Sequence, residues 1–225
     1  MVKDKEVLIS LVTFKSNWQN QLKEINSNNI ERISFFATGL DENEFEKAIG
    51  QIEKSCIREI VHVHLRNEHN EEIANYFSNK YNTQYFTLHP VSFNHCLNWS
   101  ENIRNKVVIE IPHSHVREDD YNFQKILGIC IDLSHYKDYH FFKQKNIVNR
   151  LISQYNVKMN HVGPVLFGCV SSHTVTSIRQ FNYLKYIDSN LLSDTLCLEV
   201  TNSIEEQLKY KKIIEEIIND KKYIQ

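Results

Sequence analysis

Three carboxylates lie inside apolar runs, where a charged side chain is least expected. Glu110 stands in VVIEIP, Asp132 in ICIDL and Glu199 in LCLEV. A buried charge without a partner is costly, so each of these carboxylates needs a cation, an ion pair or a proton. Few positive residues are near them in the sequence. The pattern therefore favours a metal site or an acid/base site over three separate surface carboxylates.

Histidine is the second functional residue type, because it is both the commonest metal ligand and a near-neutral acid/base group. The chain has 11 histidines, and several fall at the ends of apolar runs: His64, His89, His135 and His161, with His173 after Ser171-Ser172. His62 and His64 share one side of their run, which suits either ligands or a hydrogen-bonded core pair. His173 could instead begin the next helix. We expect His69 and His95 on solvated surfaces, and His113 and His115 in a polar loop.

The elements that carry these residues alternate between strand and helix. Eight β-branched or aromatic runs occupy residues 7–14, 32–39, 58–65, 83–90, 106–112, 127–135, 157–163 and 195–201. The segments between them show helical spacing of apolar residues, with helix starts expected at Asp41 and Ser92. Nearly continuous apolar strands are typical of a parallel sheet that is covered on both faces.

Eight such units predict a single α/β domain over residues 1–225, a (β/α)8 TIM barrel with a parallel eight-stranded sheet. An open doubly wound sheet is the alternative, but it usually has a glycine-rich first turn. Here that turn reads Phe14-Lys15-Ser16-Asn17, and the chain has only 5 glycines. In a barrel, the carboxyl ends of all strands meet at one mouth, so the polar residues at the strand ends should converge there.

Charge and cysteine usage exclude several classes of protein. Lys and Arg number 26 against 28 Asp and Glu, a formal charge of −2, so no surplus of positive charge is present for gripping a nucleic acid. The 5 cysteines form no CxxC pair, which argues against a disulfide framework and a structural zinc knuckle. No run is long enough to span a membrane or serve as a signal peptide. We expect a cytoplasmic protein without membrane contact; a homo-oligomer is left open.

The order of the motifs resembles the xylose isomerase-like TIM barrels, which include sugar isomerases and epimerases and the endonuclease IV family. The resemblance spans residues 58–201. It consists of His-Pro after the fourth strand, Glu in the fifth, Asp-x-x-His at the sixth, His in the seventh and Glu in the eighth. The segments are TLHP (87–90), VVIEIP (107–112), CIDLSH (130–135), MNHVG (159–163) and CLEV (197–200).

The resemblance implies two different ligand sets. The isomerase and epimerase pattern makes one divalent metal site from Glu110, Asp132, His161 and Glu199, with His135 beside it or facing the substrate. The endonuclease pattern adds His64, His89, His135 and an Asp-x-His pair, to hold three zinc ions. Here that pair reads Ser171-Ser172-His173, so the aspartate is missing and only His173 remains.

The leading interpretation is a metal-dependent isomerase or epimerase acting on a small, sugar-like polyhydroxy carbonyl substrate. Mn²⁺ or Zn²⁺ suits the mixed carboxylate and imidazole ligands. Glu110 and Glu199 are the acid/base pair, with His135 as a further catalytic candidate. Two alternatives stay open: a zinc-dependent phosphodiesterase or abasic-site endonuclease, and a non-catalytic barrel that retains part of the site.

Overall fold

The computed structural model describes residues 4–14, 17–112, 123, 125–138, 140, 144–167 and 170–220. Its main sheet has nine parallel strands in the order β1-β11-β8-β7-β6-β5-β4-β3-β2. They are β1 (Glu6–Leu8), β2 (Ser10–Val12), β3 (Arg32–Phe36), β4 (Glu59–His64), β5 (Tyr85–Leu88), β6 (Val107–Ile111), β7 (Gly128–Asp132), β8 (Val157–Val162) and β11 (Thr195–Leu198). Every strand run expected from the sequence is present.

The sheet closes into a barrel because its two ends belong to the same stretch of chain. β1 and β2 are separated only by Ile9; β1 pairs with β11, whereas β2 pairs with β3. The Ser34 amide donates to the Ile9 carbonyl at 2.9 Å, which bridges the interruption. β1 and β2 are thus two halves of the first strand, and the ring has eight strand positions. The predicted (β/α)8 barrel is confirmed.

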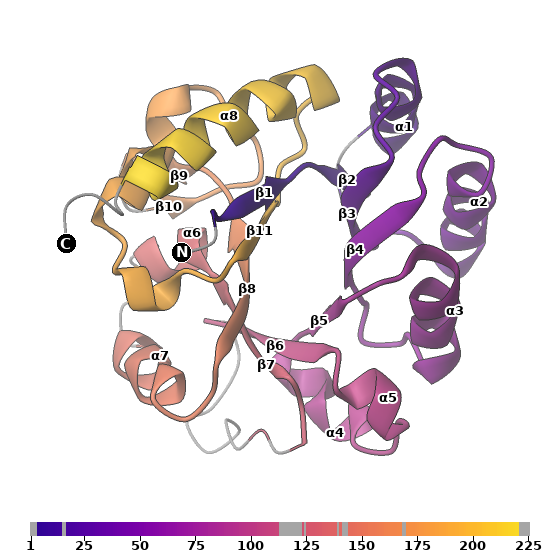
Figure 1. Ribbon diagram of the computed structural model, residues 1–225, viewed down its shortest axis with the longest axis horizontal. Coiled ribbons are helices and arrows are strands. Elements are labelled where there is room, and N and C mark those ends of the chain that lie inside the picture. The colour runs from indigo at the N-terminus through magenta and orange to yellow at the C-terminus, as the bar shows by residue number, and fades with distance from the viewer. Residues whose placement is uncertain are drawn as a thin grey trace.

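Helices surround the strands on the outside of the barrel, as Figure 1 shows. The α-helices are α1 (Trp18–Ser27), α2 (Glu42–Ile52), α3 (Glu71–Tyr81), α4 (Phe93–Cys96), α5 (Glu101–Arg104), α6 (Leu133–Lys137), α7 (Lys145–Ile152) and α8 (Ile204–Asp220). Between β8 and β11 the chain instead forms an antiparallel hairpin and two 3-10 stretches. These are β9 (Val165–Leu166), β10 (Val170–Ser171), Ile178–Tyr186 and Ser189–Leu191. Within the described ranges, no helix is both long and apolar enough to cross a membrane.

The two expected helix starts differ in how they are capped. Asp41 caps α2 with a full capping box, in which its side chain accepts from the Glu44 amide at 2.8 Å and the Glu44 side chain returns to the Asp41 amide. Ser92 precedes α4 as predicted, but its side chain makes no capping hydrogen bond. The chain enters α4 through a 3-10 turn over Pro90–Ser92 instead.

Two apolar clusters pack against the two faces of the barrel wall. The larger one lies between strands and helices, and the smaller one consists of Leu8, Val12, Phe36, Val61, Val108, Cys130, Met159 and Cys197. Because side chains alternate across a strand, the smaller cluster marks the face that points into the barrel. Four of the five cysteines, Cys56, Cys96, Cys130 and Cys197, are free thiols as expected, and Cys169 lies outside the described residues.

Candidate metal centre and active site

The strand period places the sequence-predicted ligands on the inner face of the barrel. Val108, Cys130, Met159 and Cys197 each lie two residues before a polar residue: Glu110, Asp132, His161 and Glu199 respectively. Residues two apart on a strand share a face, so these four polar side chains also point inward, one step nearer the carboxyl ends. They therefore meet above the apolar filling of the barrel.

The structure brings those four residues together as one possible metal site. One donor atom from each of Glu110, Asp132, His161 and Glu199 lies within 4.8 Å of the others. The Nδ1 atom of His161 is 3.7 Å from Glu110 Oε2 and 3.5 Å from Glu199 Oε2. Ligands at about 2.1 Å from one ion are roughly 3.4 Å apart in a tetrahedral arrangement. The two distances from His161 Nδ1 are therefore close to the separation of two ligands on one divalent cation.

Two of the four residues present buried polar atoms that have no hydrogen bond within the described part of the chain. Asp132 Oδ1 accepts from Ser134 Oγ at 2.7 Å and from the His135 amide at 2.9 Å, whereas Asp132 Oδ2 accepts none. His161 Nδ1 is also buried without a hydrogen bond. Such atoms are costly unless a ligand satisfies them. His161 Nδ1 lies toward Glu110 and Glu199, and Asp132 Oδ2 lies 3.3 Å from His135 Nδ1. The mixed N/O donor set of the cluster fits a metal ion.

The two glutamates of the cluster have opposite electrostatic environments. Burial alone would raise the pKa of Glu110, but the adjoining His161 and His64 outweigh it and hold this pKa well below its usual range. Burial, followed by the charges of Glu110 and Asp132, raises the pKa of Glu199 well above its usual range. Two neighbouring carboxyl groups whose pKa values are pushed apart are suited to act as base and acid.

His64 and His89 approach the same carboxylate oxygen from the other side. His64 Nε2 lies 2.8 Å and His89 Nε2 3.7 Å from Glu110 Oε2, and the two imidazole rings are 4.9 Å apart. His64, Glu110 and His161 form a second group of donor atoms within 4.8 Å of one another. Glu110 therefore stands between two sets of donors, which matches the larger ligand set implied by the endonuclease pattern.

The remaining predicted residues, His135 and His173, lie at the edge of the cluster. His135 Nδ1 is 3.3 Å from Asp132 Oδ2, and His173 Nδ1 is 3.8 Å from Glu199 Oε1. Their rings are 6.5 Å apart and perpendicular. Burial tends to lower the pKa of His135, but the charges of Asp132, Glu110 and Asp138 raise it. Burial lowers the pKa of His173.

Asp138 is a buried carboxylate that the sequence analysis did not single out. Its Oδ2 accepts from the Ser171 amide at 2.8 Å and from Ser171 Oγ at 2.7 Å, and its Oδ1 accepts from the His140 amide. Ser171 occupies the position where the endonuclease pattern has its aspartate. Here that position anchors the β9–β10 hairpin to Asp138. The Asp-x-His spacing of Asp138 and His140 was the available signal in the sequence.

His62 belongs to a hydrogen-bonded network directly below the cluster. Its Nδ1 lies 2.7 Å from Ser34 Oγ and its Nε2 lies 2.8 Å from Thr87 Oγ1. Thr87 Oγ1 is in turn 3.5 Å from His161 Nε2. Burial, then the charges of His161 and His64, lowers the pKa of His62 well below its usual value, so His62 is neutral.

The network has two consistent proton arrangements, which run in opposite directions. In one, His161 Nε2 donates to Thr87, Thr87 donates to His62 Nε2, and His62 Nδ1 donates to Ser34. In the other, every bond is reversed and the proton of His161 is on Nδ1. Only the first arrangement leaves His161 Nδ1 without a proton, as a metal ligand requires. His62 and Thr87 therefore orient the His161 ring through the hydrogen bond at its Nε2 atom.

We expect His62→Gln to weaken Mn²⁺ or Zn²⁺ binding about 10- to 100-fold, the usual effect of losing a residue that orients a ligand. Isothermal titration of the metal-free protein measures the affinity, and ¹⁵N spectra of the imidazoles report which nitrogen of His161 carries the proton. Met159→Leu, a volume-conserving change inside the barrel, is the control. Unchanged affinity and an unchanged His161 tautomer in His62→Gln would remove His62 from the site.

Four other histidines were expected to be away from the site. His95 is exposed, as predicted. His69 is not on a solvated surface, because only 7% of it is exposed and its ring packs on Phe45 at 4.5 Å between ring centres. This burial could not be predicted from the segment around His69, because Phe45 belongs to a different strand-helix unit. His113 and His115 lie outside the described residues.

Comparisons with known proteins support the fold. No family model matches the sequence, and no curated protein matches it. Among solved structures, the chain is similar to "Crystal Structure of SacUVDE", with a TM-score of 0.53 and 14% identity over 95% of this chain and 99% of that chain. That likeness shows the fold. The chain is a TIM barrel. A phosphoribosyl anthranilate isomerase from Thermus thermophilus also matches, with a TM-score of 0.45 and 13% identity over 96% of this chain and 98% of that chain.

Proposed function

We propose that this protein is a divalent-metal-dependent isomerase or epimerase that acts on a small, sugar-like polyhydroxy carbonyl compound. One observation carries the proposal: Glu110, Asp132, His161 and Glu199, at the carboxyl ends of four strands, place one donor atom each within 4.8 Å of the others. Mn²⁺ or Zn²⁺ suits this donor set. A bound ion of this kind supplies Lewis-acid polarisation of adjacent substrate oxygens.

The chain's own residues supply the proton transfers. Glu110 is ionised, because the imidazoles of His161 and His64 lower its pKa, and it accepts the proton from the carbon next to the carbonyl. Burial and the charges of Glu110 and Asp132 raise the pKa of Glu199, so this carboxyl is the group that would return a proton to the substrate. His135, at 3.3 Å from Asp132, is placed to contact a substrate hydroxyl beside the ligands.

The direct test is exchange of a carbon-bound proton with solvent. In D₂O with Mn²⁺, the protein is expected to introduce deuterium next to the carbonyl of at least one ketose in a panel of hexuloses and pentuloses. Chelation of the metal should stop the exchange, and NMR follows it. Glu31→Gln, an exposed change beside the start of β3, is the matched control for Glu110→Gln. Exchange that survives chelation, or no exchange with any ketose by the metal-loaded protein, would contradict the proposal.

A second candidate is metal-assisted hydrolysis of a phosphodiester, and one observation favours it. His64 and His89 converge on Glu110 Oε2, which adds donors that a single-metal isomerase does not need. The replacement of the aspartate by Ser171, now bound to Asp138, counts against a third ion. Hydrolysis of bis(p-nitrophenyl) phosphate with Zn²⁺, together with no proton exchange, would favour this candidate.

A further inference from the structure

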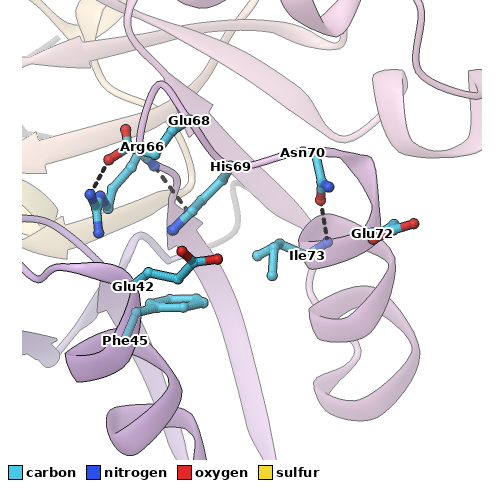
Figure 2. Close-up of a pocket in the computed structure, with 8 residues that line it drawn as sticks. All are labelled: Glu42, Phe45, Arg66, Glu68, His69, Asn70, Glu72 and Ile73. Atoms are coloured by element: carbon cyan, nitrogen blue, oxygen red, sulfur yellow. Dashed lines mark hydrogen bonds and ion pairs between the residues drawn. The ribbon is translucent and has the colours of Figure 1, made fainter.

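A separate cavity lies beyond the end of β4 that carries His64. It has a volume of about 350 Å³ and is lined by Glu42, Phe45, Arg66, Glu68, His69, Asn70, Glu72 and Ile73. The loop from Arg66 to Asn70 follows β4, and the first turns of α2 and α3 complete the wall (Figure 2). The cavity therefore lies at the same end of the barrel as the metal donors, and its volume is in the range of small-molecule sites.

His69 is the central polar group of this cavity. Figure 2 shows its ring extending from the loop toward Glu42 and Phe45. Its Nδ1 accepts a hydrogen bond from the Arg66 amide at 3.2 Å, so that nitrogen carries no proton. Burial, then the charge of Arg66, lowers the pKa of His69 to about 4, so the ring is neutral at pH 7 and its proton is on Nε2.

The Nε2–H group of His69 has no acceptor among the described residues. Only 7% of the residue is exposed. This donor is open to the cavity, where solvent or a ligand can accept its hydrogen bond. The ring is held in place by Phe45 and by the Arg66 amide. His69 is therefore a fixed hydrogen-bond donor directed into a cavity.

The other polar groups of the lining determine which ligand fits. The lining contains three carboxylates, those of Glu42, Glu68 and Glu72, and one guanidinium, that of Arg66, which already binds the Leu40 carbonyl and Glu68. This excess of negative charge disfavours a phosphate or carboxylate. A hydroxyl group can accept from His69 and donate to a carboxylate, so it satisfies both kinds of group.

We propose that this cavity binds an uncharged, hydroxyl-rich group and is the subsite for the end of the substrate that lies away from the metal. The inference rests on the proposed function, because it places the rest of a polyhydroxy substrate next to the reacting carbon. It adds that the substrate carries no phosphate at that end. His69, Glu42 and Glu72 are the residues that recognise the hydroxyl groups.

The test is a titration of uniformly ¹⁵N-labelled protein with D-fructose and with D-fructose 6-phosphate. D-Fructose is expected to shift the His69 Nε2 signal saturably, and the phosphate ester to bind more weakly, most clearly at low salt. His69→Phe keeps an aromatic ring against Phe45 and should abolish the response, which is then followed through the backbone amides of Asn70 and Ile73. Glu42→Gln combined with Glu72→Gln, which leaves His69 intact, should weaken binding about tenfold. Glu31→Gln is the control.

Equal or tighter binding of the phosphate ester would overturn the inference, and so would an unmoved His69 signal with D-fructose in the folded protein. The metal cluster is assayed separately by metal titration. A protein that binds metal but shows no response at His69 retains the proposed function and loses this subsite. A protein that binds no metal loses the proposed function, whatever His69 does.

Discussion

Glu110→Gln and Asp132→Asn are each expected to abolish tight retention of a divalent metal while the barrel stays folded. Glu110 Oε2 lies 3.7 Å from His161 Nδ1, and Asp132 Oδ2 is one of the buried atoms without a hydrogen bond, so both substitutions remove a ligand charge from the centre of the cluster. The expected loss of affinity is at least the 10- to 100-fold seen when only a supporting residue is removed.

The fold should survive because the apolar packing of the barrel does not include these side chains. The core residues around them, such as Val108, Cys130 and Met159, are unchanged in both variants. The charges of Glu110 and Asp132 raise the pKa of Glu199, so the three carboxylates repel one another. Removing one of the buried charges relieves this repulsion. Metal analysis beside circular dichroism checks both parts. Full metal occupancy in both variants, with Glu31→Gln as control, would show that the site is elsewhere.

The second large effect concerns nucleic acid, and we expect no detectable binding or incision of abasic-site DNA at physiological salt. A protein that neutralises six or more phosphates loses about 10³- to 10⁵-fold in affinity between about 50 and 200 mM salt, and an overall surplus of basic residues favours such contacts. This chain has a formal charge of −2. The cavity that His69 lines has three carboxylates and one arginine in its lining.

The measurement is a fluorescence-anisotropy titration with a duplex that contains an abasic site, together with a gel assay for incision, at low and physiological salt. The Zn²⁺-loaded protein is used, because that is the form the hydrolase candidate requires. Efficient incision that decreases steeply with salt and is lost in His64→Gln would favour the hydrolase over the isomerase. A matched duplex without the abasic site controls for non-specific binding.

The strand pattern predicted the barrel and the position of the main cluster because both depend on local periodicity. A residue two positions beyond an inward-facing Val108 or Met159 must also face inward, whatever the rest of the chain does. The split of the first strand at Ile9 and the hairpin after β8 were not predictable in this way. They depend on how the ends of the sheet meet and on the contact between Asp138 and Ser171.

The polar networks could not be predicted from the sequence either, because they depend on contacts between separate strand-helix units. His62 and His64 were recognised as neighbours on one face, but the bonds from His62 to Ser34 and Thr87 follow from the register of three strands. His69 was expected in solvent because its own segment is polar. Its burial comes from Phe45 in the preceding unit.

The metal content of the purified wild-type protein tests the central claim most directly. After growth with added manganese and zinc, elemental analysis and titration of the chelated protein should both give about one tightly bound divalent ion per chain, as expected for one mixed carboxylate and imidazole site. Two or three equivalents would favour the hydrolase, through the additional donors His64 and His89. A protein that holds no divalent metal, and binds none on titration, would contradict the account and leave a barrel without a catalytic metal centre.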